Sequence, residues 1–122
     1  MEDNELIYGL DPNGSFTTID VRDAIIRCFF QAHNKEIEKI FKDLCFQDEK
    51  QSKEFKQQHT ELLIRTFFND VNADFDHPTK QSLIDVVNKC KQFAQSFRDQ
   101  TIIEENAALI QTLIDNSKEE QP

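Results

Sequence analysis

The chain has 122 residues, of which 38% are hydrophobic and 30% are charged, and its formal net charge is -9 at pH 7. This length suits one domain with its own core, and the composition is too apolar for a disordered chain. No membrane helix is expected because no apolar run approaches ~20 residues, and the acidic balance disfavours nucleic acid and anionic membranes as partners.

Residues 1–16 are expected to form a short hairpin or an extended arm. Both glycines of the protein, Gly9 and Gly14, fall in this segment, and the stretch 11–14, DPNG, has the composition of a β-turn. A lone hairpin is only marginally stable in water. The arm should therefore lie on the helices, through the apolar residues Leu6, Tyr8, Leu10 and Phe16.

The next two segments, 18–46 and 52–72, have the periodicity of amphipathic helices. Thr17 or Thr18 can cap the first helix, and Thr17 with Asp20 three residues later matches the capping box. Apolar residues then recur every three or four positions, which is typical of a helix with one buried face. They include Ile25, Ile26, Phe29, Phe30 and Ile37 in the first segment and Phe55, Leu62, Leu63, Phe67 and Val71 in the second.

Two further helices are expected at 78–98 and 101–116, and the tail 117–122 is expected to be disordered. Pro78 suits the first turn of a helix, because the N–H group that proline lacks is not needed there. Four amphipathic helices with short connections pack most simply as an antiparallel bundle. The sequence therefore predicts an all-α fold, an antiparallel four-helix bundle in one domain over residues 1–116.

The acidic charge is concentrated at the two ends of the chain. Residues 1–23 hold six acids and one base, which gives -5, and residues 92–122 hold six acids and two bases, which gives -4. The residues between them sum to zero. Acidic ends keep a small protein soluble. They also favour a basic protein surface or a metal ion as the counterpart.

Three cysteines, Cys28, Cys45 and Cys90, are far apart and form no CxxC pair, which disfavours a disulfide framework or a zinc knuckle. Together with an acidic start where a secretory signal would be basic, they indicate a cytoplasmic protein. Cys28 and Cys90 fall among apolar residues, whereas Cys45 adjoins a polar connection and is the most accessible. No glycine-rich phosphate loop or serine nucleophile motif is present, so no catalytic residue and no cofactor is assigned.

The stretch from Asp70 to Gln81, DVNADFDHPTKQ, partly matches a calcium loop. Such a loop takes ligands from places 1, 3, 5, 7, 9 and 12, with a glycine at 6 and a bidentate Glu at 12. Phenylalanine stands at the sixth place and Gln81 at the twelfth. The first four ligand places hold Asp70, Asn72, Asp74 and Asp76. Two interpretations stay open: weak binding of a divalent cation such as calcium or magnesium, and ordinary turn chemistry of Asp and Asn side chains.

His33 and His59 lie in register with the apolar faces of the first two helices, and each is four residues from apolar residues on both sides. Two inward imidazoles with carboxylates could hold zinc or iron, or act as acid and base. The alternative function is therefore a metal-binding helical bundle, with hydrolysis as an option. Against it, the chain has no HExxH motif and no Glu-x-x-His pair, and a boundary histidine with a packed ring is the simpler interpretation.

Two pairs of adjacent aromatic residues, Phe29-Phe30 and Phe67-Phe68, raise a separate question. Neighbours on a helix point about 100° apart, so both rings of a pair cannot face one line of a core. Either these helices are buried on two sides, or Phe30 and Phe68 line a groove or a dimer seam.

The predicted function is that of a non-enzymatic, acidic, cytoplasmic helical protein. It is expected to work through protein–protein interaction, in a regulatory or adaptor role. The partner is either another protein or a second copy of the chain, in a homodimer. An apolar helical surface framed by the acidic ends would carry the interaction.

Overall fold

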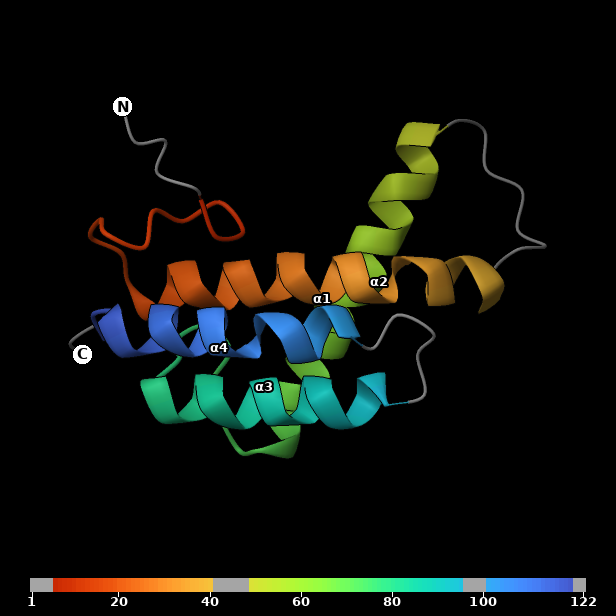
Figure 1. Ribbon diagram of the computed structural model, residues 1–122. Helices are drawn as coiled ribbons and strands as arrows, with labels where there is room; N and C mark the ends of the chain where they lie inside the picture. The colour runs from red at the N-terminus through yellow and green to blue at the C-terminus, as the bar shows by residue number, and fades with distance from the viewer. Residues whose placement is uncertain (1–5, 41–48, 96–100, 120–122) are drawn as a thin grey trace, which may run out of the picture.

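The computed structural model describes residues 6–40, 49–95 and 101–119, with the backbone alone at 32–40, 49, 94 and 101–104. These residues fold into an all-α bundle (Figure 1), which confirms the predicted fold class. Its helices are α1 (Thr18–Ile40), α2 (Glu49–Asp70), α3 (Lys80–Ala94) and α4 (Thr101–Asn116). α2 begins at Glu49 and not at residue 52. The predicted ends of the first and third helices, at 46 and 98, lie outside the described residues.

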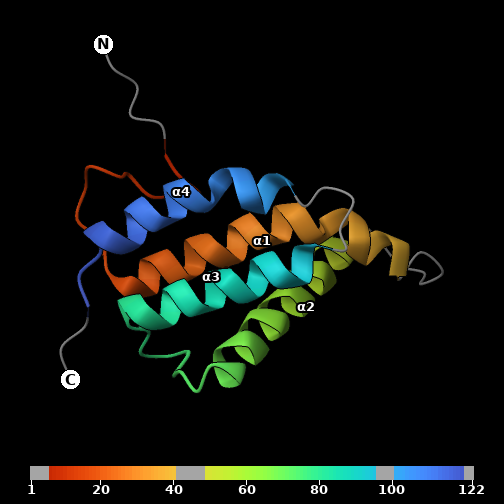
Figure 2. The same ribbon diagram turned by 60° about the horizontal axis from the view of Figure 1, so that its bottom comes forward.

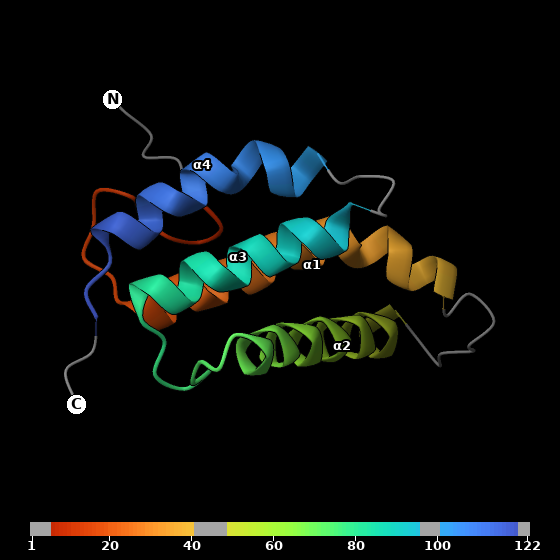
Figure 3. The same ribbon diagram turned by 90° about the horizontal axis from the view of Figure 1, so that it is seen from below.

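Successive helices run antiparallel, so that α1 and α3 point one way and α2 and α4 the other (Figure 2). α1 and α3 each pack against all three other helices, whereas α2 and α4 do not contact each other in the described part of the chain. The α1–α3 pair is therefore the centre of the bundle, with α4 on one side and α2 on the other (Figure 3). α2 crosses α1 obliquely, and its N-terminal half extends past the other three helices (Figure 1).

The buried apolar side chains form one cluster around Phe29 of α1, which is fully buried. Its ring lies 5.9 Å from the ring of Phe67 and 6.0 Å from that of Phe93, measured between centroids. Such contacts add about 1 kcal/mol each to the free energy gained from burial alone. On α2, Leu62 was predicted on the apolar face but is 62% exposed, and Ile64 takes a buried place.

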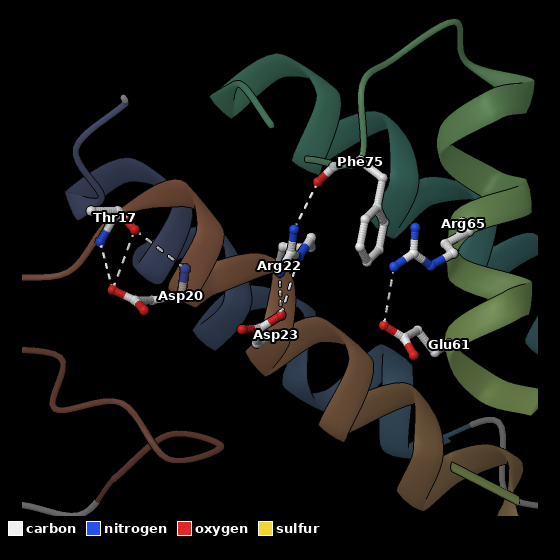
Figure 4. Close-up of polar contacts among 7 residues, drawn as sticks. All are labelled: Thr17, Asp20, Arg22, Asp23, Glu61, Arg65 and Phe75. Atoms are coloured by element: carbon white, nitrogen blue, oxygen red, sulfur yellow. Dashed lines mark hydrogen bonds and ion pairs between the residues drawn. The ribbon is translucent and has the colours of Figure 1, made fainter. Parts of the chain in front are cut away.

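The start of α1 has the predicted capping box. The backbone N–H of Thr17 donates to Asp20 Oδ2 at 2.9 Å, and the N–H of Asp20 donates to Thr17 Oγ1 at 3.4 Å (Figure 4). Each side chain thus pairs a backbone donor that the first helical turn leaves unsatisfied.

The start of α3 differs from the prediction. Pro78 is buried and precedes the helix, and Thr79 is the N-cap. The Thr79 hydroxyl accepts from the N–H of Ser82 at 3.1 Å, which is a bond that proline cannot offer. The N–H of Lys80 donates to Glu119 Oε1 at 2.8 Å. A carboxylate from the far end of the chain therefore lies at the positive end of α3.

The N-terminal arm contains the predicted turn and a tighter one before it. In the stretch 11–14 the N–H of Gly14 donates to the carbonyl of Asp11 at 2.9 Å. The tighter turn has Tyr8 and Gly9 at its centre, with φ angles of 48° and 89°. Two consecutive positive φ angles are typical of a two-residue hairpin turn.

This tighter turn decides which residues of the arm touch the helices. Ile7 and Leu10 exchange two backbone hydrogen bonds, of 2.7 and 3.0 Å, across it. Ile7, Leu10 and Tyr8 all pack against the core, whereas Leu6 is 62% exposed. The prediction that Leu6 faces the helices is wrong, because the turn interrupts the alternation of a strand. Phe16 is buried as predicted.

The prediction of a disordered tail is wrong for residues 117–119. The N–H of Lys118 donates to the carbonyl of Phe16 at 3.0 Å, and the carbonyl of Lys118 accepts from the N–H of Thr18 at 3.1 Å. The segment after α4 therefore pairs with the backbone on both sides of Thr17, at the start of α1. Residues 120–122 lie outside the described residues.

Thr18 offers a direct test of this terminal packing. It is fully buried, and its hydroxyl has no hydrogen-bond partner among the described residues. Because an unpaired buried hydroxyl is costly, Thr18→Val, which keeps the shape, should raise the free energy of unfolding by about 1 kcal/mol. Urea unfolding followed by circular dichroism measures the change. Thr18→Ser keeps the hydroxyl and removes a methyl group, so it should lower the free energy of unfolding. If both variants were less stable than the wild type, the Thr18 hydroxyl would have to form a hydrogen bond in the folded protein.

Candidate functional site

A groove of about 650 Å³ lies between α1 and the N-terminal half of α2. The α1 wall consists of Asp23, Ile26, Arg27, Phe30 and Gln31. The α2 wall consists of Lys53, Glu54, Gln57, Gln58 and Glu61. Ile26 and Phe30 are partly exposed and form the apolar floor. The rim is polar throughout.

The groove follows from a mismatch between the two helix faces. On both helices the lining residues recur at spacings of three and four, so each set lies on one side of its helix. Of the described residues that line the groove, the α1 side carries Ile26 and Phe30, whereas the α2 side carries only polar and charged ones. A polar face gains little from closing over apolar side chains. The two helices therefore leave between them a groove that is open to solvent and apolar only on its α1 side.

The rim of the groove is nearly neutral although the chain is strongly acidic. It holds the acids Asp23, Glu54 and Glu61 and the bases Arg27 and Lys53, which gives a formal charge of 2 - 3 = -1. Both signs occur on both walls. A charged partner of either sign would therefore meet some repulsion here, whereas a partner with mixed charges would not.

Phe75, from the loop between α2 and α3, is held by two arginines whose neighbours or partners Asp23 and Glu61 line the groove. Its ring lies between two guanidinium groups, with the Cζ atom of Arg22 4.2 Å and that of Arg65 4.0 Å from the ring centroid (Figure 4). Arg22 also donates to the carbonyl of Phe75 at 2.8 Å. Cation–π contacts of this kind contribute about 0.5 to 2 kcal/mol each.

The two arginines that hold Phe75 are each paired with an acid of the groove rim. Arg22 contacts Asp23 at 2.9 Å, and Arg65 contacts Glu61 at 3.5 Å (Figure 4). These carboxylates offset the repulsion between two cations on one ring. The Arg22, Phe75 and Arg65 stack thus joins α1, α2 and the loop, and it fixes where Asp23 and Glu61 lie.

The two predicted surface aromatics lie in different environments. Phe30 lines the groove. Phe68 is fully buried, and its ring meets that of Phe75 edge-on at 5.4 Å. The prediction that Phe68 lines a surface is therefore wrong, because the loop covers α2 on that side. The polar wall of α2 was not predicted, since its residues have the composition of any exposed helix.

The predicted calcium ligands do not converge. Among the described residues, no group of three or more His, Cys, Asp or Glu side chains could hold a metal ion, so Asp70, Asp74 and Asp76 do not form one site. Asp74 Oδ1 accepts from the N–H of Asp76, and Asp74 Oδ2 lies 3.0 Å from His77 Nδ1. Asn72 has a positive φ of 57°. These contacts are the turn chemistry that was the other interpretation.

The two predicted histidine ligands are not brought together by any described contact. His59 is half-buried on α2. The side chain of His33 lies outside the described residues. The metal-binding alternative therefore stays a prediction.

The two described cysteines are core residues. Cys28 is fully buried and Cys90 is 2% exposed. Burial raises the pKa of the Cys28 thiol, although a hydrogen bond from Tyr8 opposes this shift. Burial, with the nearby Cys28 as a lesser cause, raises the pKa of the Cys90 thiol. Both thiols are thus kept protonated and poorly nucleophilic. Cys45 lies outside the described residues.

No family model, no curated protein and no solved structure matches this chain. Among the described helices, none is long and apolar enough to cross a membrane.

The stack on Phe75 can be measured with a double-mutant cycle. Phe75→Leu keeps apolar volume but removes the π face, and it should lower the free energy of unfolding by about 1 to 2 kcal/mol. Combined with Arg65→Gln, the two effects should be non-additive by about 0.5 to 1 kcal/mol. Urea unfolding of the four proteins gives this coupling. A coupling near zero would mean that Arg65 does not stabilise the ring.

The contact between Asp74 and His77 predicts a pH effect. The bond from His77, followed by the backbone N–H of Asp76, holds the pKa of the Asp74 carboxyl below its ordinary value of 3.8. Because the folded pKa is depressed, the stabilisation is present above pH ~4 and is lost as the pH falls through the folded pKa. His77→Ala should move the Asp74 pKa back toward its ordinary value, as measured by carboxyl-carbon NMR. An unchanged titration would show that the bond does not form in solution.

Proposed function

We propose that this protein is a non-enzymatic binding protein of regulatory or adaptor type, and that it holds a segment of a protein partner in the groove between α1 and α2. The observation that carries the proposal is an apolar floor, Ile26 and Phe30, within a fully polar rim. A surface of this kind suits an amphipathic segment, whose apolar side chains enter the groove while its polar ones meet the rim.

The form of the groove favours a polypeptide over a small molecule. Small-molecule sites usually bury most of their ligand in an apolar cleft with few polar groups. Here the apolar part is limited to two side chains one helical turn apart, which matches the spacing of anchors on an amphipathic helix. Three amides on the rim, Gln31, Gln57 and Gln58, can each donate and accept hydrogen bonds.

Composition supports the same class of partner and a cytoplasmic location. The net charge of -9 opposes phosphate backbones and anionic lipid surfaces. The described cysteines, Cys28 and Cys90, are free thiols in the core, as is common in a reducing compartment. A protein with mixed surface charge meets neither obstacle.

Site-directed photocrosslinking in cells that express the protein tests this function. The crosslinker p-benzoylphenylalanine is placed at Gln57, on the groove wall, and in a matched protein at Gln111, an exposed position on α4. Position 57 should yield discrete crosslinked polypeptides that position 111 does not. They should be reduced at least about tenfold by Phe30→Asp and by the surface change Gln31→Arg, both of which spoil the groove.

Leu109→Asp is the control for these variants, because Leu109 is an exposed apolar residue on α4, away from the groove. It should leave the crosslinks unchanged. Circular dichroism of each variant checks that the fold is kept. Equal crosslinking at positions 57 and 111, or crosslinks that survive both groove variants, would refute the groove as the binding surface.

A further inference from the structure

We infer that the occupant of the groove is a second copy of this chain, and that Leu62 of each copy enters the groove of the other. This inference rests on the proposed function, and it specifies the partner for the same site. Three observations support it: the position of Leu62, the placement of α2 in the bundle, and the distribution of charge.

Leu62 is a large apolar side chain that is 62% exposed on α2. It follows Glu61 directly and lies one helical turn after Gln58, and both of those residues belong to the groove wall. A symmetric dimer uses the same patch on both chains, so a projecting side chain and the hollow that receives it must lie close together on one molecule. Leu62 meets this condition through Gln58 and Glu61, which adjoin it on α2 and line the groove.

α2 is also placed where a second chain can reach it. Among the described residues it contacts α1 and α3 but not α4, and its N-terminal half extends past the other helices (Figure 1). Two α2 helices can therefore lie side by side across a two-fold axis, each covering the seam between α1 and α2 of the other chain. This arrangement would cover Leu62, which the chain itself leaves mostly exposed.

The distribution of charge favours the groove face for contact between two copies. At -9 per chain, two molecules repel each other over most of their surface. The segment from 24 to 91, which provides all of the groove except Asp23, sums to zero. Lys118 of the C-terminal segment pairs with Phe16 and Thr18 at the start of α1. With a formal rim charge of -1, the groove carries only a small part of the net charge of -9, so like-charge repulsion across it is weak.

The rim itself is complementary to its own copy. The α2 wall carries Lys53 beside Glu54 and Glu61. When two such walls run antiparallel, each lysine can meet an acid of the other chain, whereas a uniformly acidic wall would be repelled. Mixed charge on both walls therefore fits a second copy better than a uniformly basic partner.

Sedimentation equilibrium of the purified full chain tests the inference over about 1 to 200 μM, a range suited to moderate affinity. The wild-type protein should show a monomer–dimer equilibrium above its monomer mass of 14.3 kDa. Leu62→Asp should weaken dimerisation by about 30-fold or more, because a charge would then enter an apolar hollow. Its folding should be unaffected, since Leu62 is mostly exposed; circular dichroism checks this.

Leu109→Asp is the matched control, with the same substitution at an exposed leucine of α4, and it should dimerise like the wild type. Purified protein with p-benzoylphenylalanine at Gln57 should form a crosslinked dimer. A strictly monomeric wild type would overturn the second copy as occupant, and so would a dimer that survives Leu62→Asp or is lost equally in Leu109→Asp. If cells then give groove-specific crosslinks to another polypeptide, the proposed function stands and only the occupant is wrong; no groove crosslink in either setting refutes both.

Discussion

The close packing of α1 on α3 is the constraint on which the rest of the structure depends. These two helices run parallel along one diagonal of the bundle and are in direct contact, with Cys28 of one near Cys90 of the other. When one diagonal of a four-helix bundle is short, the other is long, and α2 and α4 are held apart. α2 therefore packs against α1 and α3 with one side only. Its N-terminal half diverges from the bundle, and the groove lies between this half and Ile26 and Phe30 of α1.

What could be predicted from the sequence depends on contacts between near neighbours. The helical stripes, the capping box of Thr17 with Asp20 and the turn at 11–14 all join residues within four positions, and all three are present. The bond between Glu119 and Lys80 joins residues 39 positions apart, so local pattern contains no sign of it. The turn at Tyr8 is similar, because tyrosine rarely adopts a positive φ. It is held by Arg27, whose Nε donates to the Tyr8 carbonyl at 2.6 Å.

Only part of the candidate site could be predicted, because its remaining features also depend on how the helices pack. Periodicity shows that α2 has an apolar side, but adjacent residues differ by only about 100° in direction, so the crossing of the helices decides which of them is buried. The oblique crossing of α2 buries Ile64 and Phe68 and exposes Leu62. Phe75 then covers Phe68 from a loop. Because no periodic pattern extends into a loop, the helical periodicity could not predict that the Phe75 ring lies between two arginines.

The α1 wall of the groove is ordered by segments that are not part of the helices. At one end Arg22 ties the loop at Phe75 to Asp23, and farther along Arg27 lines the groove while it binds the N-terminal arm. The arm comes so close there that a Cβ on Gly9 would lie 3.0 Å from the Arg27 guanidinium, and the φ of 89° at Gly9 is one that residues with a Cβ rarely adopt. A long side chain loses up to about 2 kcal/mol of conformational entropy when a partner immobilises it. For Arg27 much of that cost is met in folding, and the pairing of Asp23 with Arg22 likewise orders a carboxylate of this wall. Less of the contact energy on the α1 wall is therefore offset by ordering of side chains when a partner binds.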